Sequence, residues 1–168
     1  MKTIVTISRQ YGSGGRFIGR LLADELGIPF YDKEIIAQAS ENSGFAQEFI
    51  KENEQKMRGI SSFAFTSSMW GSNIVNNFEN IESRIYSSEA DAIEKFAKQG
   101  ACVIVGRCAD YVLKDKYKCL DVFIHADMKD RVERVVNIYH RTDDAKKAEK
   151  LIKENDRMRA RQIGRAHV

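Results

Sequence analysis

A glycine-rich turn directly follows the first β-branched segment of the chain, and this arrangement most constrains the fold. Residues 3–8 read Thr-Ile-Val-Thr-Ile-Ser, which is typical of a strand. The turn at residues 11–15 reads Tyr-Gly-Ser-Gly-Gly. Gly27 then ends a helix whose apolar face we expect to contain Phe17, Ile18, Leu21, Leu22 and Leu26. The segment therefore predicts a strand, a tight turn and a helix in succession.

Two continuous apolar runs later in the chain predict strands buried on both faces, at residues 101–106 and 120–126. A shorter strand is expected at residues 29–31, and helical patterns occupy residues 128–139 and 142–160. The alternation of strand and helix predicts an α/β fold with a mostly parallel sheet flanked by helices. His125, inside the second run, is expected in the core rather than at a ligand.

The middle of the chain, residues 44–98, is expected to be helical with one interruption at residues 59–72. That interruption is rich in serine and contains Phe63, Phe65, Met69 and Trp70. The aromatic side chains could line a ligand pocket, although anchoring of the loop to the core is the preferred interpretation.

Composition excludes several classes of protein. The 168 residues suit one domain, and the single proline argues against a linker between modules. The chain contains no apolar run long enough for a membrane span or a signal peptide. Three cysteines without metal-ligand spacing indicate neither a disulfide framework nor a zinc site, so we expect a cytoplasmic protein.

The glycine turn has the composition of an anion-binding loop, formed by Gly12, Ser13, Gly14, Gly15 and Arg16. Glycines allow backbone amides to converge on an anion, and the helix N-terminus adds its positive dipole end. The loop departs from the pattern G-x-x-x-x-G-K-[ST], because the lysine and the hydroxyl residue are replaced by Gly15 and Arg16. Phosphate binding is favoured over a plain tight turn.

The basic residues are concentrated near the C-terminus. Residues 129–161 carry 11 Lys and Arg against 7 Asp and Glu, and Arg157, Arg159 and Arg161 alternate there. Such a cluster suits phosphate groups, although a solvated helix face is the simpler interpretation. Nucleic-acid binding ranks lower, because the excess is modest and no matching motif is present.

Four segments in order resemble the cytidylate kinase-like family of P-loop nucleoside monophosphate kinases. They are TISRQYGSGGR at 6–16, GIPFYDK at 27–33, CVIVGRCAD at 102–110 and NDRMRA at 155–160. The resemblance implies a P-loop NTPase-like parallel sheet with a helical substrate-binding insertion at 33–98 and a basic lid at 141–161. It implies a single domain over residues 1–162.

The resemblance also assigns roles to individual residues. A donor ATP would lie on residues 12–16, with Mg²⁺ bridging its phosphates, no metal ligand assigned in the protein, and Arg16 in place of the missing lysine. The acceptor would be held by Asp32, Lys33, Arg107 and Asp110, whose alternative role is a salt bridge at the strand ends. Cytidylate kinases have the acid directly after the arginine, whereas here it is displaced by two positions.

The lid assignments come from the last matching segment. Asp156 and Arg159 lie three residues apart, which places them on one helix face, and they would help to hold the acceptor and stabilise the transferring group. Arg157, Lys153 and Arg141 would be further lid cations. An ordinary ion pair on the helix surface is the alternative for Asp156 and Arg159.

The expected function is ATP-dependent phosphorylation of CMP or dCMP, with small-molecule partners, no membrane or nucleic-acid partner, and an undetermined oligomeric state. Alternatives are a non-catalytic nucleotide-binding or regulatory protein, and a kinase of another small molecule. Residues 163–168, IGRAHV, correspond to codons that match the start of a common sequencing adapter. We therefore expect this tail to be non-native and the last strand of the fold to be missing.

Overall fold

The structure is a computed structural model that describes residues 3–32 and 72–166, with side chains described for 3–32 and 86–161. The chain divides into two compact units, one formed by Met1–Asp32 with Phe96–Val168 and the other by Lys33–Lys95. Lys33 and the predicted features at residues 44–71 lie outside the described residues. The sheet and the candidate site belong to the first unit.

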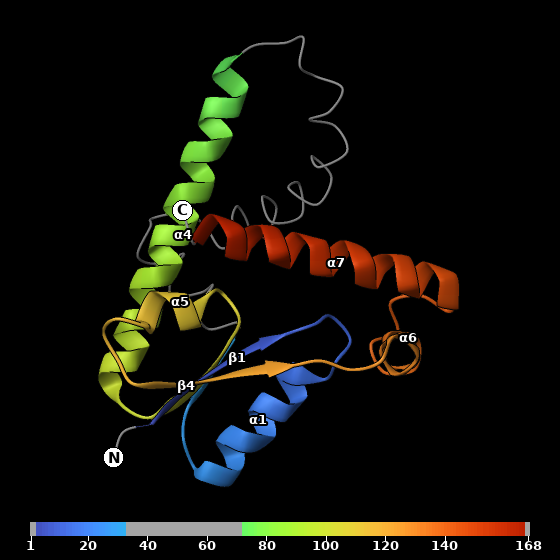
Figure 1. Ribbon diagram of the computed structural model, residues 1–168, viewed down its shortest axis with the longest axis horizontal. Helices are drawn as coiled ribbons and strands as arrows, with labels where there is room; N and C mark the ends of the chain where they lie inside the picture. The colour runs from blue at the N-terminus through green and yellow to red at the C-terminus, as the bar shows by residue number, and fades with distance from the viewer. Residues whose placement is uncertain (1–2, 33–71, 167–168) are drawn as a thin grey trace. The chain divides into compact units, whose positions relative to one another are not determined.

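Four parallel strands form the sheet in the order β2-β3-β1-β4 (Figure 1). Their bounds are Ile4–Arg9 for β1, Phe30–Tyr31 for β2, Cys102–Val105 for β3 and Cys119–Ile124 for β4. The register places Ile4 between Cys102 and Cys119 on the neighbouring strands. This sheet confirms the predicted α/β class, and its carboxyl edge collects the ends of β1, β2 and β3.

Five described helices accompany the sheet: α1 (Gly15–Leu26), α4 (Ser72–Gln99), α5 (Ala109–Leu113), α6 (Met128–Asn137) and α7 (Ala145–Ala166). The predicted helices after the glycine turn and near residues 128–139 and 142–160 are confirmed. Figure 1 shows α1 and α5 on opposite sides of the sheet. Within the described residues, no helix is both long and apolar enough to span a membrane.

The main core lies between α1 and the sheet. Its buried members are Val5, Ile7, Ala23, Phe30, Val103 and Val105. All four residues of β3 are buried, which confirms the prediction that this run is covered on both faces. A second, smaller cluster of Val135, Ala148 and Ile152 joins α6 to α7. Burial of these aliphatic side chains supplies the stabilisation that fixes both helices near the strand ends.

The face of α1 that packs on the sheet differs from the predicted one. Its buried residues are Gly15, Gly19 and Ala23, whereas Phe17 is 68% exposed. Ile18, Leu21 and Leu26 are exposed as well. The reason is close packing, because a Cβ on Gly19 would lie only 2.9 Å from Val105 Cγ2. Small residues let the helix approach the strands, so most of the large apolar side chains lie away from the packed face. Leu22 is the exception, because it is partly buried and packs against the core as predicted.

The prediction that residues 120–126 are buried on both faces is also wrong. β4 lies at the edge of the described sheet and pairs with β1 alone. Leu120 is 56% and Phe123 58% exposed, and His125 beyond the strand is exposed rather than part of the core. An apolar run of this length is compatible with a central strand or an edge strand, because the position of a strand in the sheet depends on its pairing partners.

Candidate functional site

The glycine turn forms an open helix N-terminus at the carboxyl end of β1. Gly12 has φ 80° and Gly14 has φ 84°, a left-handed conformation that favours glycine. Gly14 is the N-cap of α1, and no cap hydrogen bond from a side chain is found there among the described residues. The first-turn amides of α1 are therefore uncapped in this part of the chain and lie at the positive end of the helix dipole. Such a terminus is suited to bind phosphate oxygens.

A hydrogen bond within the glycine turn stabilises it. The Ser13 hydroxyl donates to the carbonyl oxygen of Gln10 at 2.9 Å, and Ser13 is buried. The loop also packs tightly on its neighbours, because a Cβ on Gly15 would lie 2.7 Å from Arg9 Cβ. These contacts restrain Ser13 and Gly15 within the predicted donor-binding residues 12–16.

Arg134 on α6 lies beside this open terminus and was not among the site residues predicted from the sequence. Its Nη1 donates to the carbonyl oxygen of Gly12 at 2.8 Å. A Cβ on Gly14 would lie 3.4 Å from Arg134 Cζ, so the guanidinium packs against the N-cap itself. A full positive charge is thus added to the partial charge of the helix. The available signal was the i,i+3 spacing of Arg131 and Arg134 in the helix after a strand.

Arg131 and Asp156 fasten the same loop to α7. Arg131 is 4% exposed, and its Nε donates to the Tyr11 carbonyl oxygen at 2.8 Å. Its Nη2 pairs with Asp156 Oδ2, while Asp156 Oδ1 accepts the Tyr11 amide at 2.7 Å. Asp156, predicted to bind the acceptor, is here engaged in positioning the loop. Its role toward an acceptor stays a prediction.

Arg159 approaches the loop from the same face of α7. Its Nη1 donates to the Arg9 carbonyl oxygen at 2.9 Å, and its guanidinium lies 5.5 Å from the centre of the Tyr11 ring. Burial lowers the pKa of Arg159, while the carboxylate of Asp156 opposes that effect. Asp156 and Arg159 therefore share one helix face, as their spacing predicted, and together contact residues 9–11.

A second group of charges surrounds Asp32 at the end of β2. Arg16 Nε lies 2.7 Å from Asp32 Oδ2, and Arg9 Nη2 lies 4.0 Å from Oδ1. Burial and the neighbouring Arg159 lower the pKa of Arg9 to about 10, against the opposing effect of Asp32. The structure thus brings the predicted residues Arg16 and Asp32 together as an ion pair. It adds Arg9, which was not predicted.

The chain leaves β3 through three consecutive residues in the left-handed region: Gly106 at φ 80°, Arg107 at φ 59° and Cys108 at φ 53°. For a residue with a Cβ, this conformation costs on the order of 1–2 kcal/mol. It places Arg107 at the carboxyl edge, close enough for its charge to act on Arg9. Asp110, predicted beside Arg107, lies in the first turn of α5.

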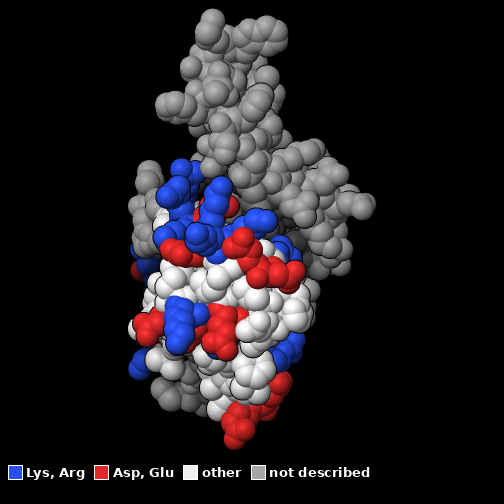
Figure 2. All heavy atoms as spheres, turned by 90° about the vertical axis from the view of Figure 1, so that its right-hand side faces the viewer, with Lys and Arg blue, Asp and Glu red and all other residues white. Residues whose placement is uncertain are grey.

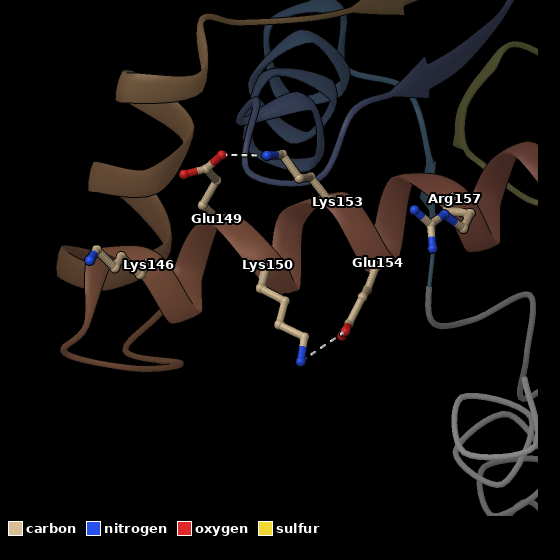
Figure 3. A pocket seen from close by; sticks show the side chains of 6 residues that line it. All are labelled: Lys146, Glu149, Lys150, Lys153, Glu154 and Arg157. Atoms are coloured by element: carbon tan, nitrogen blue, oxygen red, sulfur yellow. Dashed lines mark hydrogen bonds and ion pairs between the residues drawn. The ribbon is translucent and has the colours of Figure 1, made fainter. Parts of the chain in front are cut away.

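The other predicted lid cations lie on a different face of α7. Lys153 and Arg157 line a hollow of about 360 Å³ (Figure 3). Lys153 pairs with Glu149 at 2.5 Å. Residues 157 and 159 are separated by about 200° around a helix, so both cannot face the loop.

Figure 2 shows Lys and Arg side chains gathered at the level of α7. Arg141 is exposed in the segment between α6 and α7.

Metal-ligating side chains are not clustered in the described part of the chain, where no group of three or more His, Cys, Asp or Glu could hold an ion. The site is instead cationic, with an open helix terminus and the guanidinium groups of Arg9, Arg16, Arg134 and Arg159 in its surroundings. Chemically, it can bind and orient phosphate groups and stabilise negative charge on them.

Comparisons with known proteins identify the family and the fold. A sequence model of the cytidylate kinase-like family matches residues 4–167. Among solved structures, a crystal structure of an uncharacterized protein from Eubacterium ventriosum is similar, with a TM-score of 0.65 and 23% sequence identity. The similarity covers 97% of this chain and 76% of that one, and it concerns the fold. A search of curated proteins found no match.

Proposed function

The chain belongs to the cytidylate kinase-like family, and from this premise we propose that it is an ATP-dependent nucleoside monophosphate kinase. Family membership supports a nucleotide kinase-type activity in general. ATP as donor and CMP or dCMP as acceptor are the finer parts of the proposal.

The observation that carries the proposal is the pairing of an uncapped helix N-terminus with Arg134. The backbone amides of α1 and the Arg134 guanidinium converge on the same space, next to left-handed Gly12 and Gly14. Phosphoryl transfer needs no nucleophilic side chain, because the acceptor itself attacks. It needs fixed positive charge around the transferred group, which this arrangement supplies before substrate arrives.

The remaining residues divide into two roles in this proposal. Asp32 and Arg107 lie at the carboxyl ends of β2 and β3 and would bind or orient the acceptor, whereas Arg16, in the first turn of α1, would contact the donor phosphates. Arg131 and Asp156 hold the Tyr11 backbone and so act as positioning residues for the loop. A donor bound on α1 and an acceptor near Asp32 would meet at the sheet edge, where effective concentration favours reaction.

Mg²⁺ would supply charge neutralisation on the donor phosphates. The described residues offer the ion few ligands, because the Ser13 hydroxyl is directed to Gln10 and Asp32 is paired with Arg16. The ion would be held mainly by the phosphates and water, a mode common for Mg²⁺ in nucleotide enzymes.

A non-catalytic nucleotide-binding protein is the second candidate, and one observation favours it. The loop lacks the lysine and hydroxyl residue of G-x-x-x-x-G-K-[ST], and Arg16 is occupied by Asp32 at 2.7 Å. In this case ATP would bind without turnover. A kinase of another small molecule differs from the leading proposal only in the acceptor.

A coupled assay of ADP release distinguishes the three candidate functions. The protein is incubated with Mg·ATP and, in turn, CMP, dCMP, UMP, AMP, GMP and buffer alone. Acceptor-dependent ADP release, highest with CMP or dCMP, supports the leading proposal. ATP binding without ADP release from any acceptor supports the second candidate. Release with an acceptor outside this panel would support the third.

A further inference from the structure

Arg9 is the last residue of β1, and its side chain crosses the carboxyl edge of the sheet. A Cβ built on Gly106 would lie 1.7 Å from Arg9 Nη1, so the guanidinium rests directly on the glycine backbone at the end of β3. The side chain is 20% exposed. Ligands of open α/β sheets bind at this edge, beyond the carboxyl ends of the strands.

The Arg9 guanidinium is poorly satisfied by the protein. An arginine carries five N–H donors. Within the described residues, the ion-pair partner of Arg9 is Asp32 at 4.0 Å, which is beyond hydrogen-bond distance, and the Arg9 guanidinium donates no hydrogen bond to any of them. Asp32 is already paired with Arg16 at 2.7 Å. A largely buried charge with unused donors is costly unless a ligand completes it.

Like charges surround this side chain. The positive charges of Arg159, Arg107 and Arg16 act on it, while Asp32 is the opposing negative group. Among the described charges that act on Arg9, guanidinium groups outnumber carboxylates, and Asp156 offsets part of the charge of Arg159. Repulsion between these like charges does not stabilise the unliganded fold, whereas a ligand with several negative charges would neutralise them.

We propose that Arg9 is an anion-binding residue, whose guanidinium donates to phosphate oxygens of a polyphosphate ligand at the ends of β1 and β3. The proposal rests on the proposed nucleotide function and assigns a residue to its phosphate site. In the pattern G-x-x-x-x-G-K-[ST], Arg9 replaces the first glycine of a loop that lacks the lysine. A cation at the ends of β1 and β3 would therefore be available to phosphates bound beside the loop.

The competing role is a purely structural one, in which Arg9 ties the strand ends together through Asp32. The two roles predict opposite effects on the unliganded protein. A structural tie stabilises the fold, so Arg9→Gln would lower the melting temperature. If Arg9 is instead a ligand-binding cation, Arg9→Gln removes its repulsion with the neighbouring arginines, so the melting temperature would stay the same or rise.

The test uses inorganic pyrophosphate as probe, titrated by calorimetry into the wild-type chain, Arg9→Gln, Arg9→Lys and the control Arg20→Gln. Arg20 is an exposed arginine on α1 whose guanidinium lies over Phe30, outside the cluster. We expect Arg9→Gln to weaken pyrophosphate binding roughly ten- to hundredfold, the range for charge-assisted hydrogen bonds. Arg9→Lys should fall between wild type and Arg9→Gln, and Arg20→Gln should bind like wild type.

Less than a twofold change in pyrophosphate affinity for Arg9→Gln would overturn the proposal, whatever its melting temperature. If Arg9→Gln does not fold, hydrogen exchange of the wild-type Arg9 Nε–H decides by NMR. Slower exchange at saturating pyrophosphate supports the proposal, and unchanged exchange overturns it. Because pyrophosphate binding needs no turnover, the result is independent of the kinase assay: Arg9-dependent binding in a protein that releases no ADP would refute only the kinase proposal.

Discussion

The buried guanidinium of Arg131 pairs with the carboxylate of Asp156, and between them they hold both the amide and the carbonyl of Tyr11. This ion pair joins α6 and α7 to the glycine loop. The geometry of the glycine loop thus depends on helices that follow it by more than a hundred residues. The loop and both helices are coupled through the backbone of Tyr11.

Asp156→Asn is expected to destabilise the fold by about 3 kcal/mol, because it leaves the charge of Arg131 buried without its partner. The free energy of unfolding is measured by urea denaturation. Glu154→Gln is the matched control on the same helix, since Glu154 is exposed and its pairing with Lys150 at 3.9 Å contributes less than about 0.5 kcal/mol. Equal stability of the two variants would show that the Arg131–Asp156 pair does not anchor the loop.

Gly106→Ala is expected to displace the Arg9 side chain and weaken phosphate binding. Gly106 has φ 80°, and its added Cβ would meet Arg9 Nη1 at 1.7 Å. Gly27→Ala is the control, since Gly27 has φ 63° with no atom within 4 Å of its added Cβ. Both variants share a backbone penalty of about 1–2 kcal/mol.

The difference between these two alanine variants isolates the clash with Arg9. Pyrophosphate affinity measured by calorimetry should fall in Gly106→Ala and stay unchanged in Gly27→Ala. Unchanged affinity in Gly106→Ala would mean that the Arg9 side chain can move without effect on the site.

Arg134→Ala should weaken ATP binding by about 1.5–3 kcal/mol, the range for a hydrogen bond to a charged group. Arg16→Ala is expected in the same range if Arg16 leaves Asp32 to bind donor phosphates. Lys129→Ala controls for loss of one positive charge, because Lys129 is exposed on the same helix as Arg134. Fluorescence titration with an ATP analogue gives the affinities. Wild-type affinity in Arg134→Ala would place the donor phosphates away from α1.

Arg159→Ala should lower turnover more than it lowers donor affinity, because a lid cation acts on the transferring group. The same was expected of Arg157, but the structure places Arg157 on the face of α7 that lines the hollow. Arg157→Ala should therefore have the smaller effect. Steady-state rates for both variants measure this, and a larger loss for Arg157→Ala would reverse the assignment.

The pH dependence of stability should contain a contribution from Cys102. Burial raises the pKa of this thiol from 9.0 to about 11. The unfolded chain loses the proton first, so the contribution is fully present below pH 9 and is lost as pH rises toward 11. Its size is roughly 3 kcal/mol. Urea denaturation across this range should show a steeper decline for wild type than for Cys102→Ala, and equal slopes would contradict the expectation.

The helices and strands could be predicted from the sequence more accurately than their packing and their order in the sheet. β1, the turn, α1 with its end at Gly27, and buried β3 follow from local patterns. The packed face of α1 could not be predicted, because contact with Val105 selects Gly19 over the larger Leu21. The edge position of β4 could not be predicted either, since strand order is a property of tertiary pairing.

The site was predicted as a set of residue types rather than as contacts. The glycine loop and Asp32 were found because motifs mark them. Arg134 was missed because it fits no motif and acts across 122 residues on Gly12. Arg9 lies within the matched segment 6–16, but its contact with Gly106 at the end of another strand is not visible in that segment. Long-range charge contacts of this kind depend on the fold, which a local pattern does not encode.

The central claim, that the site transfers a phosphoryl group between nucleotides, is tested most directly by following Mg·ATP and CMP with the protein by ³¹P NMR. We predict that the CMP resonance decreases while the resonances of CDP and ADP grow in equal amounts, and that Arg134→Ala slows this conversion at least about tenfold. ATP and CMP that both bind, yet whose phosphorus spectra remain unchanged over hours, would contradict the claim.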